Sequence, residues 1–263
     1  MPSNPPEMAQ FLRKLEARSS FRPDERKAIL QLPFQPRQVQ ANRDFVSRGE
    51  RVSHSCFVLE GMVGTFGQNR EGHRQITSVF MSGDMIDLQT VVLPEAMSNL
   101  QALTTTTILQ IPHSDLRRVG HRFPNIAEAF WRECVLDAAI VNEWVVNVGR
   151  RDARTRLAHL LCEVACRSGH ATPENAFVFP FPVTQAQFAD MLGLTPVHVN
   201  RTLKGLREGN VVNVAASSVE ILDWDRLADI GEFDATYLQL GSLRNGEAPK
   251  AARCASPAGQ TAS

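Results

Sequence analysis

The 263-residue sequence lacks several features that would place it in other classes of protein. No apolar run approaches the roughly 20 residues that a membrane-spanning helix needs. The N-terminus, MPSNPPEMAQ, has no basic start followed by an apolar stretch, so we expect no signal peptide. The five cysteines are scattered and without a C-x-x-C spacing, which favours reduced thiols over a disulfide framework. These absences predict a cytoplasmic protein that makes no contact with a membrane.

Neither net charge nor catalytic motifs assign the chain to a class of protein. Lys plus Arg and Asp plus Glu both number 28, so a nucleic-acid footprint would have to be a local patch. We find no nucleophile elbow, phosphate-cradling glycine loop or metal-ligand spacing. The sequence therefore predicts neither enzymatic activity nor a bound cofactor or metal. Its hydrophobic fraction of 43% supports a sizeable core.

The N-terminal part predicts two short helices followed by a β-roll. The helices are expected at 8–17 and 23–32. From about residue 34 to residue 112, short runs rich in β-branched and aromatic residues alternate with glycine-containing turns. Strands are expected at 57–59, 63–66, 76–80 and 108–111. This regular spacing predicts an antiparallel sandwich or barrel-like roll.

A long helix is expected over residues 125–149. Apolar residues recur along it at spacings of three and four, in a heptad-like seam that includes Asp137. The periodicity fits a helix packed on its own roll as well as a coiled coil between two copies of the chain. For the coiled coil, the predicted dimer seam is Phe130, Cys134, Val141, Trp144 and Val148.

The C-terminal part predicts a helix-turn-helix. A domain boundary is expected near residue 150, and a helix follows over 153–167. The first helix of the pair begins at Thr184, with Gln187 at a capping-box spacing, and ends before Gly193. The second begins with Thr195 as N-cap and Pro196 at the first helical position. A hairpin is expected over residues 211–222.

One face of the second helix carries the side-chain types that read DNA. Three apolar residues on one side of it, Val199, Leu203 and Leu206, should face the core, and the opposite side is mixed. Arginine can bond guanine in a fork, asparagine can bond adenine, and an apolar group can touch a thymine methyl. Residues 150–208 hold eight basic against five acidic residues. The predicted base-reading residues are Val197, His198, Asn200 and Arg201, and the predicted phosphate contacts are Thr184, Gln185, Thr195 and Lys204. The alternative is an ordinary helical hairpin with a solvated face.

This order of parts resembles the Crp/Fnr superfamily of bacterial transcription regulators over about residues 10–235. The resemblance is carried by FVSRGERVSHSCFVLEGMV (45–63), FMSGDMIDL (80–88), TTTTILQIP (104–112) and TQAQFADMLGLTPVHVNRTL (184–203). It implies an α+β chain with an N-terminal antiparallel, jelly-roll-like β-roll, a long dimerisation helix and a C-terminal winged helix-turn-helix. The implied partners are a palindromic double-stranded DNA operator, a second copy of the chain, an effector still to be identified and, as a further candidate, RNA polymerase.

The composition of the two ends, the break in pattern near residue 150 and the resemblance together predict the boundaries of the domains. We expect a disordered start at 1–8, an effector-type roll with its helices at 9–124, the dimerisation helix at 125–149, the winged helix-turn-helix at 150–235 and a disordered tail at 236–263.

The sequence departs from cyclic-nucleotide-binding members of the superfamily at the positions that hold the nucleotide. Leu88 stands near the position of the glutamate for the ribose, and Ala96 and Met97 replace the arginine and hydroxyl residue for the phosphate. No Arg or Lys lies between residues 74 and 117, and a buried phosphate without a cation is costly. Asn142 lies near where members meet the base. These four residues are the effector-pocket candidates, and we expect a signal other than cAMP.

Other known sensors of the superfamily fit no better. No cysteine precedes Cys56, which argues against an N-terminal iron–sulfur cluster. No Cys or His lies between His73 and His113, which argues against haem. His54 and Cys56 share one strand face, which suits a metal or, more often, a half-buried strand. The alternative function is therefore the same architecture controlled by a partner protein, or by a non-nucleotide ligand or metal at the roll. Val197 also stands where many members carry glutamate, which should change the preferred DNA site.

Overall fold

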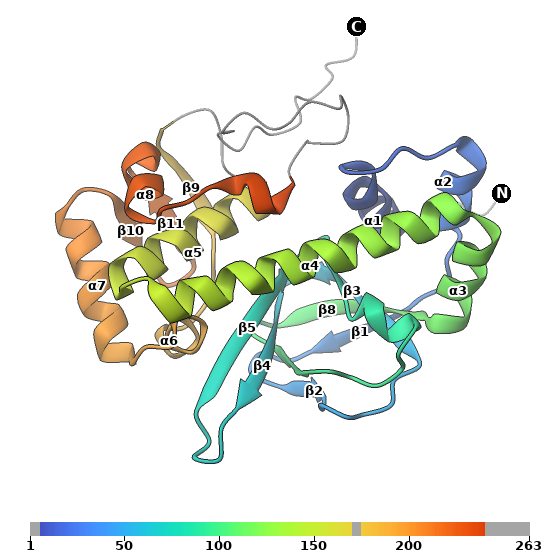
Figure 1. The fold of residues 1–263 in the computed structure, drawn as a ribbon, viewed down its shortest axis with the longest axis horizontal. Coiled ribbons are helices and arrows are strands. Elements are labelled where there is room, and N and C mark those ends of the chain that lie inside the picture. The colour runs from blue at the N-terminus through green and yellow to red at the C-terminus, as the bar shows by residue number, and fades with distance from the viewer. Residues whose placement is uncertain (1–5, 170–174, 240–263) are drawn as a thin grey trace, which may run out of the picture. The chain divides into compact units, whose positions relative to one another are not determined.

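The computed structural model describes residues 6–169 and 175–239 (Figure 1). The chain divides into two compact units, Met1–Ala138 and Ala139–Ser263. The division lies inside the long helix α4 (Pro124–Arg150) and not near residue 150, where the sequence predicted a boundary. The last turns of α4 belong to the second unit because they bond to helix α5 (Ala153–Arg167).

The first unit contains two four-stranded antiparallel sheets, which confirms the predicted jelly-roll-like roll. One sheet has the order β1-β8-β3-β6, with bounds Gln35–Val39, Thr106–Pro112, His54–Glu60 and Met85–Ile86. The other has the order β2-β7-β4-β5, with bounds Asp44–Val46, Asn99–Ala102, Met62–Gln68 and Arg74–Met81. The sequence did not predict β1, β2, β6 and β7, because they are short or, like QPRQV in β1, largely polar and exposed.

Apolar side chains from both sheets fill the interior of the roll. They come from the facing sides of the two sheets and from the loops between them. The cluster includes Cys56 and Val58 of β3 and Ala96 of the loop before β7. Its members are Val39, Val46, Val52, Cys56, Val58, Val63, Phe80, Ile86, Ala96, Leu100, Ala102 and Ile108.

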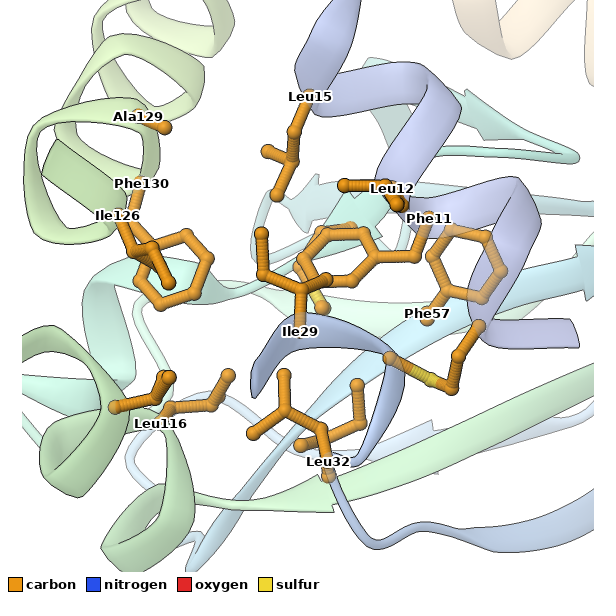
Figure 2. Packing of buried hydrophobic residues seen from close by; sticks show 14 of the residues in the cluster. Phe11, Leu12, Leu15, Ile29, Leu32, Phe57, Leu116, Ile126, Ala129 and Phe130 are labelled. Carbon is orange, nitrogen blue, oxygen red and sulfur yellow. The ribbon is translucent and has the colours of Figure 1, made fainter. Parts of the chain in front are cut away.

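Helices cover the other face of the β1-β8-β3-β6 sheet. They are α1 (Pro6–Glu16), α2 (Pro23–Leu30), α3 (His113–Arg122) and the start of α4. Figure 2 shows Phe11, Phe57 and Phe130 in this second core, with ring centroids 5.4 Å apart for Phe11 and Phe57 and 6.2 Å apart for Phe11 and Phe130. Because both faces of the sheet are buried at β3, that strand carries the continuous apolar run CFVL.

Helix α1 corrects the expected disordered start. It begins at Pro6, and Met8 is fully buried in the second core. Lys14 forms an ion pair of 2.6 Å with Asp84, which holds the helix on the turn before β6. Residues 1–5 of the expected start lie outside the described residues.

The second unit contains α5, a three-stranded sheet and three further α-helices. The sheet has the order β10-β11-β9, with bounds Val212–Val214, Ser218–Ile221 and Phe177–Pro180. The helices are α6 (Gln185–Leu192), α7 (Pro196–Glu208) and α8 (Trp224–Ile230). The predicted hairpin is confirmed as β10 and β11, and β9 adds a strand that the sequence did not predict.

Ordered structure continues past the predicted start of the tail at residue 236. A short 3₁₀-helix, η2 (Ala235–Leu238), follows α8, and Leu238 is buried. Residues 240–263 of the expected tail lie outside the described residues. In the part of the chain that the structure describes, no helix is long and apolar enough to cross a membrane.

Candidate nucleic-acid interface

The first helix of the helix-turn-helix is fixed at both ends by its own sequence. The Thr184 hydroxyl accepts a hydrogen bond of 3.2 Å from the backbone N–H of Gln187. The Gln187 side chain accepts one of 2.7 Å from the N–H of Thr184, which completes the predicted capping box. Gly193 ends α6 with φ 62°, a left-handed conformation that glycine adopts without strain. The turn to α7 is therefore short and defined.

The second helix presents the predicted face to solvent. Thr195 caps α7 by accepting the N–H of His198 at 3.3 Å, and Pro196 occupies its first turn. Val199, Leu203 and Leu206 are buried, and Val197 is 79% exposed. A valine so exposed contributes nothing to the core of its own chain, so this face is available to a partner.

The candidate base-reading residues lie on this exposed face. Asn200 and Arg201 are exposed, and His198 is half-buried. The Arg201 side chain is exposed and forms no hydrogen bond or ion pair with the side chain or backbone of another described residue, so its guanidinium is available to a ligand. The helix thus positions an apolar group, a carboxamide and a fork-shaped cation along one side.

The four candidate phosphate contacts differ in the hydrogen bonds and ion pairs that their side chains already make. The Thr184 and Thr195 hydroxyls each accept a backbone N–H as caps and keep their own O–H for donation. Lys204 is exposed and lies 3.7 Å from Glu208, a weak surface pair. The Gln185 side chain instead accepts a hydrogen bond of 2.6 Å from Asn200.

A groove of about 510 Å³ lies between α6, α7 and the turn after β10. Asn200, Lys204 and Arg207 line its α7 side, and Ala215 and Ala216 line its wing side. Sequence reasoning missed Arg207, which donates to the Val214 carbonyl at 3.4 Å and so joins α7 to the wing. Its position three residues after Lys204 was the available signal, because residues at i and i+3 share a helix face.

A buried polar network supports the helices behind this face. Glu163 of α5 is fully buried and accepts Trp144 Nε1 at 2.9 Å, Arg167 Nη1 at 3.0 Å and the Tyr237 hydroxyl at 2.8 Å. Burial and the adjacent Glu163 carboxylate raise the pKa of Tyr237, so the phenol stays protonated and donates. Burial lowers the pKa of His159, which stacks on Tyr237. The network joins the end of α4 and η2 to α5.

This network corrects the predicted dimer seam. Trp144 is bonded to Glu163, Phe130 lies in the second core of the roll, and Cys134 packs against that core. Val148 is half-buried, and Val141 is 37% exposed. Trp144 and Phe130, at 5% and 7% exposed, are packed within their own chain and leave little surface for a second copy.

The exposed apolar stripe of α4 lies one residue further round the helix. Its most exposed large members are Trp131, Val135 and Val145, at 65%, 62% and 63%. Ala138, Asn142 and Gly149 are also exposed, so positions 131, 135, 138, 142, 145 and 149 repeat at spacings of four and three. The heptad spacing is present in the helix, but the residues of the exposed stripe are those that follow each predicted seam residue by one position.

The four effector-pocket candidates lie in different environments, two buried and two exposed. Leu88, in the 3₁₀-helix η1 (Leu88–Val91), and Ala96 are buried among apolar side chains. Met97 and Asn142 are exposed. The backbone of Glu95 forms a β-bridge with that of Arg51, an exposed residue. Arg51 is therefore a cation next to the segment 75–116, which contains no Arg or Lys of its own.

The two candidate metal ligands on β3 face different surroundings. Cys56 lies in the core of the roll, where burial raises the pKa of its thiol to about 12. His54 lies with its Nε2 2.6 Å from the Gln110 amide, and burial lowers its pKa. Among residues 6–169 and 175–239, no group of three or more His, Cys, Asp or Glu side chains is arranged to hold a metal ion.

Comparison with known proteins assigns both units. Residues 36–122 match the family model of the cyclic nucleotide-binding domain, and residues 155–230 match that of the Crp-like helix-turn-helix domain. The nitrogen fixation regulation protein FixK of Azorhizobium caulinodans is 26% identical over 229 residues, 87% of this chain and 89% of that protein. A probable transcriptional activator of Rhizobium leguminosarum bv. viciae is 26% identical over 180 residues, 68% of this chain and 73% of that protein.

Solved structures support the same fold. The structure of FixK2 from Bradyrhizobium japonicum covers 76% of this chain and 98% of its own, with a TM-score of 0.68 and 20% identity. A structure of a CooA mutant from Carboxydothermus hydrogenoformans covers 75% of this chain and 88% of its own, with a TM-score of 0.62 and 18% identity.

A roll matched by a cyclic nucleotide-binding model and a second unit matched by a Crp-like helix-turn-helix model define a transcription regulator. The chain belongs to the Crp/Fnr family of such regulators.

Proposed function

We propose that the chain is a homodimeric, sequence-specific regulator that binds a palindromic DNA operator in the cytoplasm and responds to a signal other than cAMP. It acts by binding and not by catalysis. The observation that carries the proposal is the division of α7 into a buried apolar side and an exposed side with Val197, Asn200 and Arg201. Such a helix fits the major groove, where its polar groups can meet base edges.

The exposed stripe of α4 supports the dimer. It is defined as Trp131, Val135, Ala138, Asn142, Val145 and Gly149, with Val141 and Val146 beside it. Burying large apolar side chains against a second copy would remove them from water, and the heptad spacing suits a parallel two-stranded contact. Asn142 at a seam position would favour one register, because a polar group there is satisfied only opposite its counterpart.

The apolar interior of the roll supports a signal other than cAMP. Ala96 lies inside the core, so the segment that would cradle a phosphate presents a methyl group there. The alternative remains the same architecture controlled by a partner protein, or by a non-nucleotide ligand or metal at the roll. A ligand retained by the purified protein in native mass spectrometry would favour the ligand over the partner.

Two substitutions on α7 test the reading of bases. Arg201→Ala should weaken binding to the operator by roughly 1–3 kcal/mol and relax the choice of one base pair, because a fork onto guanine is lost. Lys204→Ala should weaken binding to all sequences about equally and reduce the salt slope by about one unit, because a phosphate contact is lost. The measurement is a fluorescence-anisotropy titration on operator and random DNA over a range of salt.

The contrast between these two variants is the control, since both remove one positive charge from an exposed position. Equal losses for both variants on operator and on random DNA would show that this face attracts DNA by charge alone. The proposed base reading would then be wrong.

Cyclic AMP should not bind at micromolar concentration. A buried phosphate needs a cation, and the segment from residue 75 to residue 116 supplies none. Isothermal titration calorimetry of the purified protein checks this. A micromolar dissociation constant would contradict the prediction, and loss of that binding in Arg51→Ala would identify the cation opposite Glu95 as its cause.

A further inference from the structure

Gln185 makes a contact that links the two helices of the helix-turn-helix. It is the first residue of α6, and its side-chain oxygen accepts a hydrogen bond of 2.6 Å from Nδ2 of Asn200 on α7. The two residues are 15 positions apart in the chain, and both line the groove between α6, α7 and the wing. The Gln185 side chain is therefore bonded to a candidate base-reading residue, which a residue that contacts phosphate alone would not need.

Both ends of this contact are held in place by the backbone. The capping box of Thr184 and Gln187 fixes the first turn of α6, from which Gln185 projects. The Thr195 cap fixes the first turn of α7, and the buried Val199 and Leu203 flank Asn200 in sequence and anchor the helix. Because neither helix end is loose, the hydrogen bond restricts the rotamer of Asn200 before any DNA is bound.

The hydrogen bond leaves specific donors and acceptors of Gln185 and Asn200 unused. Asn200 keeps its carbonyl oxygen as an acceptor and one N–H as a donor, and Gln185 keeps its NH₂ as a donor. This pattern belongs to the orientation in which Asn200 donates and Gln185 accepts, which leaves the Asn200 carbonyl oxygen unengaged. Adenine presents an acceptor at N7 and a donor at N6, which such a donor–acceptor edge matches. Guanine presents acceptors at both N7 and O6, so an amide oxygen would face another acceptor there.

We propose that Gln185 determines specificity as a positioning residue: it holds the Asn200 carboxamide in the orientation that reads adenine, beside the guanine bonded by Arg201. This inference rests on the proposed function, since it requires that α7 reads bases. It replaces the expectation that Gln185 contacts phosphate. The two roles differ in one measurable respect, because a positioning residue changes the ratio between base pairs and a phosphate contact does not.

The test begins with a pool of duplex DNA randomised over 20 base pairs, from which the full-length protein selects its sites. Binding of wild type, Gln185→Ala, Gln185→Glu, Asn200→Ala and the double alanine variant is then measured on the selected site and on each single-base-pair variant. Gln185→Ala should lower the preference for adenine at one position of each half-site by roughly 2- to 10-fold, the range that one neutral hydrogen bond spans. Gln185→Glu should keep that preference while weakening binding to every sequence, because a carboxylate still accepts from Asn200 but repels phosphate.

The remaining variants separate positioning from a direct contact. In the Asn200→Ala background, Gln185→Ala should change the adenine preference no further. An equal loss on every sequence in Gln185→Ala, or an unchanged preference, would overturn the inference. Failure of the proposed function would look different, because no sequence would then be enriched from the pool and Arg201→Ala would change no preference. Gln185 and Asn200 are both exposed, so thermal melts of all variants should match wild type.

Discussion

Replacing Trp131 and Val145 with glutamate together should convert the proposed dimer to monomers at micromolar concentration. Both side chains are more than 60% exposed on the same stripe of α4, and a buried apolar side chain of this kind contributes about 1.5–3 kcal/mol. Like charges would also face one another across the twofold axis. The dimer dissociation constant should rise by at least two orders of magnitude, measured by sedimentation equilibrium.

Operator binding should fall with the dimer. Two recognition helices are needed to occupy successive major grooves about 34 Å apart, and a monomer reaches only one half-site. Val178→Glu is the matched control, since Val178 is 58% exposed but lies on β9 and not on α4. This substitution should leave the molecular mass of the assembly, measured by sedimentation equilibrium, equal to that of the wild type. A wild-type protein that sediments as a monomer at micromolar concentration would show that the α4 stripe does not pair two copies.

Glu163→Ala should destabilise the second unit by about 3–5 kcal/mol, the usual cost of removing one partner from a buried ion pair. The substitution removes the buried carboxylate that pairs at 3.0 Å with Arg167, whose side chain is 7% exposed. It also leaves Trp144 Nε1 and the Tyr237 hydroxyl without the acceptor they share. Urea unfolding followed by circular dichroism measures the loss of free energy of unfolding.

Glu128→Ala provides a matched control for this effect. Glu128 also pairs with an arginine four residues on, Arg132, at 2.7 Å, but its side chain is 61% exposed. Its removal should cost less than about 1 kcal/mol, because solvent screens such a pair. Comparable losses for the two variants would show that the buried network adds no more than a surface pair.

The helix-turn-helix could be predicted residue by residue because its signals are local. Thr184 with Gln187, Gly193, and Thr195 with Pro196 act over three or four residues, and each functions in the structure as its position in the sequence predicted. The side of α7 that faces solvent also followed from periodicity, since a helix places residues three and four apart on one face whatever surrounds it. The strands of the roll were predicted only where they are long and apolar.

By itself, the sequence determined the order of the parts, the ends of α6 and α7, and the division of α7 between core and solvent, because caps, turns and helical periodicity depend on neighbouring residues. Only the tertiary structure decided which stripe of α4 is free, because Phe130 is covered by α1 and the sheet, and Trp144 by Glu163 of α5. It likewise placed Arg51 beside Glu95 and Gln185 against Asn200. Heptad spacing identifies a stripe to within one residue, and the partners that bury one stripe and leave the next exposed come from segments distant in the chain.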